Sequence, residues 1–258
     1  MGNPRMLVFF FIAFITVAQS LPFVVLHGIG DKCKHQGIYH FIELLSDWSE
    51  SQGYCIEIGN GSWDSWTMPL TKQIKKISDL RQGYNIVGFS QGNLIARGII
   101  EFCDRGPPVK RLNFDNELDP PYDMADYLSG CKFLPKLNNE IASERNSTYK
   151  DRFSSLQNLV LIMFENDTII IPKETAWFGY YPDGAFHPVL APQQTKLYTE
   201  DWIGLRTLDE AGKVKFISVS GDHLRISESD IKTYIVPYLK DHISMVTTYN
   251  TKNRRTLI

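Results

Sequence analysis

A serine flanked by glycines is the residue best placed to do chemistry in this chain of 258 residues. It lies at the centre of Gly88-Phe89-Ser90-Gln91-Gly92, between an apolar run at 84–89 and a stretch whose apolar residues recur at helical spacing. Where a strand turns sharply into a helix, the flanking positions must lack Cβ, and the central residue takes a strained conformation that exposes its side chain. The pattern therefore predicts a nucleophilic Ser90. The alternative is a glycine-rich turn whose serine only caps the helix.

A serine hydroxyl needs a base to take its proton, and the base needs an acid to orient it. Asp167 follows an apolar run at 159–164 and His223 follows another at 214–219, so both come just past a predicted strand, in the chain order Ser, Asp, His. Asp222 is a competing acid, but side chains of adjacent residues in a tight turn diverge, which favours Asp167. The pattern predicts a triad of Ser90, His223 and Asp167. Taken singly, the histidine could be an ordinary loop residue and Asp167 a capping or turn acid.

A second glycine-rich turn, His27-Gly28-Ile29-Gly30-Asp31, directly follows the apolar run at 21–26. In a hydrolase built this way, such a turn supplies one of the backbone N–H groups that hold a developing oxyanion, and the residue after the nucleophile supplies the other. The expected donors are the N–H groups of Ile29 and Gln91. The glycine spacing fits neither a dinucleotide fingerprint nor a P-loop, so a phosphate-binding turn is not expected.

The elements that must position these residues alternate between strands and helices. The run at 21–26 is near-continuous, as is typical of a strand buried on both faces of a parallel sheet. The run at 84–89 predicts a second buried strand, and those at 159–164 and 214–219 predict two more strands of the sheet. Helical spacing marks 39–48, the stretch after Ser90, and 227–239, where Pro237 is expected to kink the helix. Residues 106–135 are rich in proline and acids without a buried-strand pattern, which predicts a long surface excursion. We expect one α/β domain over 21–258.

Composition and charge restrict the class of protein. With 43% hydrophobic and 22% charged residues, the chain can bury a full core. A net charge of −2 with only short basic clusters argues against nucleic acid or an anionic membrane as a partner. The apolar run at 6–18 is too short to span a bilayer and is followed by small residues that a signal peptidase reads. Residues 1–20 therefore predict a cleaved secretory signal and no stable membrane span, with an uncleaved anchor as the alternative.

The sequons and cysteines fit a secreted chain. Sequons begin at Asn60, Asn146 and Asn166, and each alone is a weak signal for glycosylation. The four cysteines lie far apart with no Cys-x-x-Cys pair, which argues against zinc and redox chemistry and permits up to two disulfides of undetermined pairing. No metal and no cofactor is expected.

Further segments, in a fixed order, carry a family resemblance. Besides the turn at 27–31 and the serine motif they are Gln82-Gly83-Tyr84-Asn85, Phe164-Glu165-Asn166-Asp167, Trp177-Phe178-Gly179-Tyr180, Leu197-Tyr198-Thr199-Glu200-Asp201 and Gly221-Asp222-His223-Leu224. On these segments the chain resembles palmitoyl-protein thioesterases, and most of all their plant members.

The resemblance implies an α/β-hydrolase fold, with a mostly parallel sheet and helices on both faces. It implies a serine hydrolase that cleaves long-chain fatty acyl thioesters from cysteine residues of lipidated proteins, with Ser90 as nucleophile, His223 as base and Asp167 as orienting acid. Ile29 and Gln91 would again be the oxyanion donors. It further implies a glycoprotein of the secretory pathway that works in the lysosome, in the plant vacuole or outside the cell.

One departure from the family follows the nucleophile helix. There the family continues with a further strand, a Gly-Gly-x-His-x-Gly turn and a helical insert, whereas here Val109-Lys110-Arg111 runs directly into Leu112-Asn113-Phe114. We therefore expect the fold to lack one strand and the helical insert. By resemblance, the cysteine that would pair with Cys103 is also absent.

A fatty acyl chain needs an apolar groove, and its candidates by position or resemblance are Ile169, Trp177, Phe178 and Trp202. Aromatic residues at such spacing are more often part of a core. The expected partner is a fatty-acylated protein or peptide. Two rival functions remain open. One is a lipase or acyl-CoA thioesterase on the same triad, and the other is a catalytically impaired deletion isoform that binds acyl chains or partners without turnover.

Overall fold

The computed structural model describes residues 20–57, 78–104, 106–114, 127–128, 130–131 and 133–240, with only the backbone of Ser78 and Phe114. The expected signal segment, apart from Ser20, and the sequon at Asn60 lie outside the described residues. Within the described residues, no helix combines the length and the apolar character needed to cross a bilayer.

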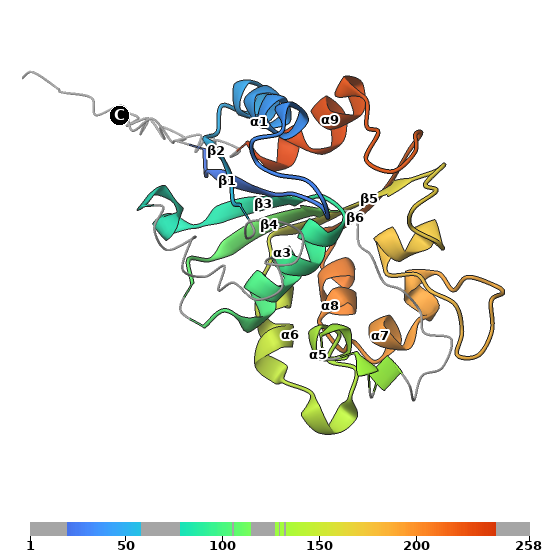
Figure 1. Ribbon diagram of the computed structural model, residues 1–258. Coiled ribbons are helices and arrows are strands. Elements are labelled where there is room, and N and C mark those ends of the chain that lie inside the picture. The colour runs from blue at the N-terminus through green and yellow to red at the C-terminus, as the bar shows by residue number, and fades with distance from the viewer. Residues whose placement is uncertain are drawn as a thin grey trace, which may run out of the picture.

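Six parallel strands form one sheet in the order β2-β1-β3-β4-β5-β6 (Figure 1). Because all strands run in the same direction, their carboxyl ends meet at one edge, and the loops that leave those ends lie along that edge. The strands are β1 Phe23–Leu26, β2 Gly53–Cys55, β3 Tyr84–Gly88, β4 Val109–Phe114, β5 Asn158–Phe164 and β6 Val214–Val219.

Helices cover both faces of the sheet, as the sequence predicts (Figure 1). On one face α1 and α9 cover a core that includes Val25, Leu45 and Ile231, and on the other α3, α6 and α8 cover a core that includes Ile86, Phe153 and Leu208. The α-helices are α1 Gln36–Ser49, α3 Gln91–Phe102, α5 Leu134–Leu137, α6 Ser147–Ser154, α7 Lys196–Thr199, α8 Leu205–Glu210 and α9 Glu228–Tyr234. The short 3₁₀ helices are η2 Ser78–Gln82, η3 Ala142–Glu144, η4 Lys173–Trp177, η5 Pro192–Gln194 and η6 Val236–Tyr238.

The end of the closing helix differs from the expectation. The sequence predicts one helix over 227–239 with a kink at Pro237, whereas α9 ends at Tyr234 and a separate 3₁₀ turn, η6, holds Pro237 near its start. A proline lacks the N–H of a helix interior but is tolerated in the first turn of a new helix. Pro237 therefore divides the segment into two elements.

The prediction of a surface excursion over 106–135 is wrong for residues 109–114, which form β4 in the middle of the sheet. β4 pairs in parallel with β3 on one side and β5 on the other, and Leu112 is fully buried. Two features hide this strand in the sequence. A register shift opposite Tyr84 and Asn85 breaks the alternation, and Lys110 and Arg111 interrupt the apolar run. The sheet consequently shows no gap where a strand was expected to be absent.

Candidate active site

Ser90 lies at the sharp turn between β3 and α3. β3 ends at Gly88, α3 begins at Gln91, and Ser90 has φ 47° and ψ −123°, a conformation that residues with a side chain rarely adopt. A Cβ at position 88 would lie 1.8 Å from Asn93 Oδ1, and one at position 92 would lie 2.2 Å from the Leu26 carbonyl oxygen. Position 92 must therefore be glycine because a Cβ would clash with the backbone of β1, and at position 88 a Cβ would displace the buried Asn93 side chain, which is the physical reason for the Gly-x-Ser-x-Gly pattern.

His223 and Asp167 form a hydrogen-bonded pair at the carboxyl edge of the same sheet. His223 Nδ1 lies 2.8 Å from Asp167 Oδ2, and the two side chains are 14% and 2% exposed. The other carboxylate oxygen of Asp167 accepts the N–H groups of Ile169 and Ile170, each at 2.9 Å. The carboxylate is thus a turn cap and an imidazole partner at once. With the proton of a neutral ring on Nδ1, Nε2 becomes the basic nitrogen.

Asp222, the competing acid, has a different arrangement. Its Oδ1 accepts the Thr168 N–H at 3.0 Å, the Thr168 hydroxyl at 2.9 Å and the His223 N–H at 2.8 Å. The His223 N–H, followed by the two Thr168 donors, lowers the pKa of Asp222 below its ordinary value. Asp222 therefore ties the loop after β5 to the loop after β6, while Asp167 contacts the imidazole ring.

The turn at 27–31 lies against Ser90. A Cβ at Gly28 would be 3.3 Å from the Cβ of Ser90, and the turn closes on itself through the Asp31 N–H and the Gly28 carbonyl. Ile29, in the middle of the turn, is 63% exposed, whereas Gln91 is buried at the start of α3. The first N–H groups of a helix have no partner within the helix. Of the two expected oxyanion donors, Gln91 directly follows Ser90, and Ile29 follows Gly28, which lies against Ser90.

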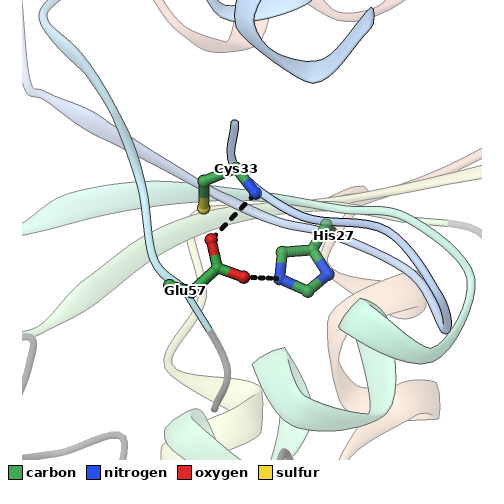
Figure 2. A group of neighbouring side chains, drawn as sticks. All are labelled: His27, Cys33 and Glu57. Carbon is green, nitrogen blue, oxygen red and sulfur yellow. Dashed lines mark hydrogen bonds and ion pairs between the residues drawn. The ribbon is translucent and has the colours of Figure 1, made fainter. Parts of the chain in front are cut away.

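A carboxylate that the sequence reasoning missed holds this turn at both ends (Figure 2). Glu57 Oε1 lies 3.6 Å from His27 Nε2, and Glu57 Oε2 accepts the Cys33 N–H at 3.0 Å. Cys33 is bonded to Cys55, one of the two disulfides that the sequence permits, and Cys103 and Cys131 keep their thiols. His27, Cys33 and Glu57 are close enough to suggest metal ligands, but a sulfur in a disulfide is not a thiolate ligand.

A small apolar cavity of about 30 Å³ joins the three loops. Its lining includes Phe89, next to Ser90, Phe164, at the end of β5, and Leu224, next to His223. The Phe164 ring also contacts the His223 ring, with centroids 6.5 Å apart. The segments that carry Ser90, Asp167 and His223 therefore converge on one small volume.

The four expected acyl-binding residues differ in exposure. Ile169 is 66% exposed, but Phe178 is fully buried between Phe153 and the guanidinium of Arg97. Phe178 is thus a core residue, which is the alternative that its spacing left open. Trp177 is half-buried, and its Nε1 donates to main-chain oxygens of β5 and β6 at 3.2 Å each.

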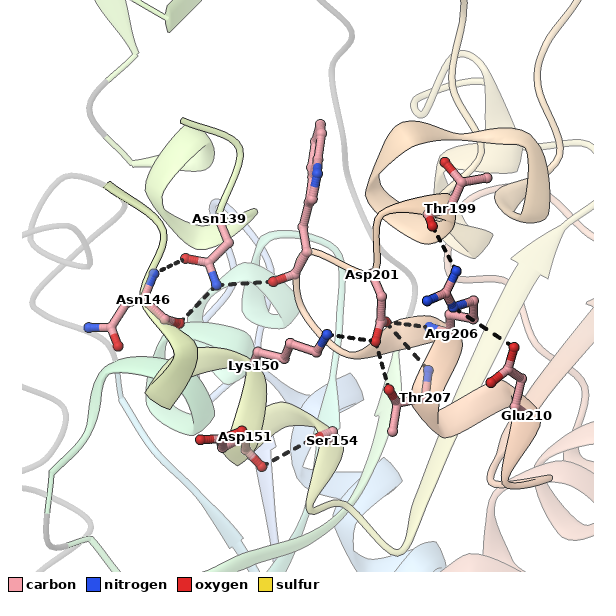
Figure 3. Close-up of polar contacts among 11 residues, drawn as sticks. Asn139, Asn146, Lys150, Asp151, Ser154, Thr199, Asp201, Arg206, Thr207 and Glu210 are labelled. Atoms are coloured by element: carbon pink, nitrogen blue, oxygen red, sulfur yellow. Dashed lines mark hydrogen bonds and ion pairs between the residues drawn. The ribbon is translucent and has the colours of Figure 1, made fainter. Parts of the chain in front are cut away.

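Trp202, the fourth of them, is a buried member of the core that α3, α6 and α8 cover, and its main chain joins a cluster of polar contacts around Asn139 and Asp201 (Figure 3). Its carbonyl accepts the Asn139 amide at 3.0 Å, and the neighbouring Asp201 receives Lys150 Nζ at 2.9 Å and the Thr207 hydroxyl at 2.6 Å. Burial raises the pKa of Asp201, but the Thr207 and Lys150 hydrogen bonds and the Lys150 charge outweigh it, so the net shift is downward. This cluster joins α6 to α8.

Two of the three sequons are described. Asn166 is exposed in the loop after β5, one residue before Asp167. Asn146 is half-buried and caps α6, because its Oδ1 accepts the Thr148 N–H at 2.9 Å. The cap uses the Asn146 side-chain oxygen and not the amide nitrogen, which is the atom that a sugar would modify.

The parallel sheet, the helices on both faces and the serine at the sharp turn after β3 define an α/β hydrolase. The family model of palmitoyl protein thioesterase matches residues 22–113 and 118–223, so the chain belongs to that family.

Relatives agree with this assignment. The chain is 30% identical over 276 residues to palmitoyl-protein thioesterase 3 of Dictyostelium discoideum, covering 88% of this chain and 92% of the relative. It is 30% identical over 254 residues to the lysosomal thioesterase PPT2 of Homo sapiens, covering 79% of this chain and 82% of the relative. Among solved structures it is similar to an esterase of Pyrococcus furiosus, with 14% identity, a TM-score of 0.44, and coverage of 85% of this chain and 81% of that chain.

Proposed function

We propose that this chain is a serine hydrolase that cleaves long-chain fatty acyl thioesters from cysteine residues of lipidated proteins. The observation that carries the proposal is the 2.8 Å contact of His223 Nδ1 with Asp167 Oδ2 at the sheet edge where Ser90 occupies its strained turn. Membership of the thioesterase family supports the choice of a thioester as substrate.

In the proposed mechanism, His223 Nε2 takes the proton of the Ser90 hydroxyl, and Ser90 Oγ attacks the acyl carbonyl carbon. The backbone N–H groups of Ile29 and Gln91 hold the oxyanion of the tetrahedral intermediate. The cysteine thiolate leaves and receives the proton, and a water activated by His223 then releases the fatty acid. A thiol with an ordinary pKa of about 8.5 is a good leaving group, so the step needs little acid assistance.

The acyl chain would lie on the outer surface of the sheet edge. A cavity of about 30 Å³ has room for only a few water molecules, so it cannot enclose a long chain. Large apolar side chains are exposed on the loops after β1, β5 and β6, namely Ile29, Ile169, Ile171 and Leu224, and burying methylenes against them stabilises by about 0.8 kcal/mol each. Ile169 is the residue of the expected set that fits this role.

We extend the proposal to the compartment. A human relative at 30% identity is named a lysosomal thioesterase, and the expected signal at 1–20 and sequons at Asn60, Asn146 and Asn166 suit a secretory route. The chain would be a glycoprotein of a lysosome or vacuole, with secretion from the cell as a further destination.

The first prediction tests the nucleophile. Ser90→Ala removes the hydroxyl and is expected to abolish both labelling by a fluorophosphonate and hydrolysis of a palmitoylated cysteine peptide, while circular dichroism stays native. The control is Ser143→Ala, an exposed serine of η3, which keeps both activities. Labelling that persists in Ser90→Ala would assign the nucleophile to another residue.

The same assay separates the rival functions. Side-by-side rates on a palmitoylated cysteine peptide, an acyl-CoA and a simple carboxylester distinguish the proposed activity from an acyl-CoA thioesterase or a lipase. A folded wild-type protein that neither hydrolyses nor is labelled would support the impaired deletion isoform.

The length of the chain is the reason that the deletion isoform stays a rival. The alignment with the Dictyostelium relative runs over 276 residues although the chain has 258, so the relative carries residues without a counterpart here.

A further inference from the structure

Resting on the function proposed above, we infer that Glu57 is a positioning residue, because its carboxylate holds the turn that carries the Ile29 N–H in place beside Ser90. Glu57 follows the edge strand β2 and lies outside the serine, histidine and aspartate motifs. It touches neither the nucleophile nor the base in the described structure.

The contacts of Glu57 bracket the turn (Figure 2). One carboxylate oxygen faces His27, the residue before Gly28, at 3.6 Å, and the other accepts the N–H of Cys33 at 3.0 Å. The disulfide from Cys33 to Cys55 fastens the far end of the turn to β2, two positions from Glu57. A single side chain therefore fixes the start and the end of the segment that lies between them.

The turn has few contacts of its own. Ile29 is mostly exposed, Gly30 has φ +75° with open space around it, and the turn is closed by one long hydrogen bond of 3.3 Å between the Asp31 N–H and the Gly28 carbonyl. The turn also lies against the serine turn, because a Cβ at Gly28 would be 3.3 Å from the Cβ of Ser90 and 3.4 Å from the Phe89 carbonyl oxygen. Any shift of the turn would thus change the distance between the Ile29 N–H and the carbonyl that Ser90 attacks.

The hydrogen-bonding roles of the His27 ring follow from its two neighbours. Its Nδ1 lies 3.0 Å from the Gly28 carbonyl, which can only accept, so Nδ1 donates. Its Nε2 is buried and faces a carboxylate, which also can only accept when ionised, and it has no hydrogen bond to any described residue. The pair with Glu57 is therefore attractive when both nitrogens are protonated, that is, when His27 is an imidazolium.

The surroundings of His27 make Glu57 its main electrostatic partner. Within the described residues, Glu57 is the ionisable group paired with the ring. Asp31, in the same turn, is engaged by His35 Nδ1 at 2.5 Å. Glu57 therefore holds this side of the His27 ring in place.

The test compares Glu57→Ala with Glu57→Gln in the full chain. Alanine removes both contacts, whereas glutamine keeps an oxygen for the Cys33 N–H and adds an N–H₂ that can donate to the neutral Nε2 of His27. Asp47→Asn, an exposed position of α1, is the control for the loss of one negative charge. The measurements are kcat and KM on a palmitoylated cysteine peptide, the Ki of an alkyl trifluoromethyl ketone, which forms a tetrahedral serine adduct, and thermal melting.

We expect Glu57→Ala to lower kcat by about 10- to 100-fold with KM within twofold, since a misplaced oxyanion donor weakens transition-state binding. The Ki of the ketone should rise by a similar factor, and Glu57→Gln and Asp47→Asn should stay within about threefold of the wild type in kcat.

An unchanged kcat in folded Glu57→Ala, or a loss explained by a smaller folded fraction, would overturn the inference. So would a loss of kcat without a rise in the Ki of the ketone, because the oxyanion site would then be intact. Failure of the proposed function is recognised separately, because the wild type would then show no hydrolysis of the palmitoylated peptide, or Ser90→Ala would retain it, whatever the Glu57 variants do.

Discussion

The Asp222 side chain can orient His223 and Asp167 through hydrogen bonds that involve neither the His223 ring nor the Asp167 carboxylate. Its single oxygen Oδ1 receives three donors, two from Thr168 and one from the backbone of His223. Thr168 directly follows Asp167, so the bridge fixes both partners of the His223 and Asp167 contact through their main chains. The lowered pKa of Asp222 keeps it ionised, and therefore an acceptor, well below neutral pH.

This bridge predicts different results for two substitutions. Asp222→Asn keeps an oxygen for all three donors and is expected to retain kcat within about threefold, whereas Asp222→Ala leaves the donors unpaired and should lower kcat by about tenfold through misplacement of the base. The downfield proton resonance of His223 Nδ1 should persist in the asparagine variant and broaden or vanish in the alanine variant. Equal activity of both variants would show that the bridge does not position the histidine.

The sequence could predict the local part of the site but not its long-range supports. The serine motif is recognisable from five consecutive residues, but its steric reason is local only at Gly88, which faces Asn93, whereas Gly92 faces the Leu26 carbonyl oxygen of β1. Asp167 and His223 could be placed because each follows a recognisable strand. Glu57 could not, because it comes after the three-residue edge strand β2 and contacts residues 24 to 30 positions earlier.

At the scale of the element, α3 carries structural constraints at both of its ends. It starts at the serine turn, and near its other end Arg97 and Glu101 form a fully buried ion pair at 3.1 Å. Arg97 also donates to Asn138 Oδ1 and to the Leu137 carbonyl, which ties α3 to α5. Burial raises the pKa of Glu101 to about 7, although the charge and hydrogen bond of Arg97 work in the opposite direction.

The raised pKa of Glu101 predicts how the free energy of unfolding depends on pH. The folded state favours the protonated carboxyl, so the contribution of Glu101 is complete below its ordinary pKa of 4.5 and is lost as pH rises through about 7. Glu101→Gln is neutral at every pH and keeps an oxygen for Arg97. Its stability relative to the wild type should therefore increase by roughly 3 kcal/mol between pH 4.5 and pH 7, measured by urea denaturation.

The control for this measurement is Glu144→Gln, an exposed glutamate of η3, which should leave the pH profile of the wild type unchanged. A constant difference between Glu101→Gln and the wild type at all pH values would show that Glu101 titrates alike in the folded and unfolded chains.

β4 is the element that sequence patterns did not reveal. Strand prediction depends on uninterrupted alternation of apolar and polar residues or on an unbroken apolar run. In β4 the register shift opposite Tyr84 and Asn85 breaks the alternation, and Lys110 and Arg111 break the apolar run. The expectation of an absent strand came from a missing family motif. The pairing of β4 with both β3 and β5 is a property of the whole sheet, which no local window contains.

At the scale of the molecule, β4 makes the sheet continuous but leaves a polar group in the core. Asn113 is 1% exposed on the face that α1 and α9 cover, and neither its Oδ1 nor its Nδ2 has a hydrogen bond to any described residue. It lines the apolar cavity below the serine turn. An unpaired buried amide costs about 1–3 kcal/mol, so Asn113 lowers the stability of the fold.

Replacing this amide should stabilise the protein. Asn113→Leu removes the unpaired groups and adds apolar contact in the cavity, and it is expected to raise the free energy of unfolding by about 1–3 kcal/mol in urea titrations. Asn113→Asp, of nearly equal size, should lower it because a carboxylate would be buried without a partner. A destabilised leucine variant would indicate that the amide binds a water molecule in the cavity.

The backbone at Ser90 has an evolutionary consequence. A φ of 47° with a ψ of −123° is a conformation that glycine accepts readily and that costs other residues on the order of 1–3 kcal/mol. Selection for robust folding alone would favour glycine at position 90 over generations. If Ser90 is the nucleophile, selection for catalytic turnover explains why a serine is kept at this position. Gene copies that are no longer under selection for turnover should therefore lose the serine early.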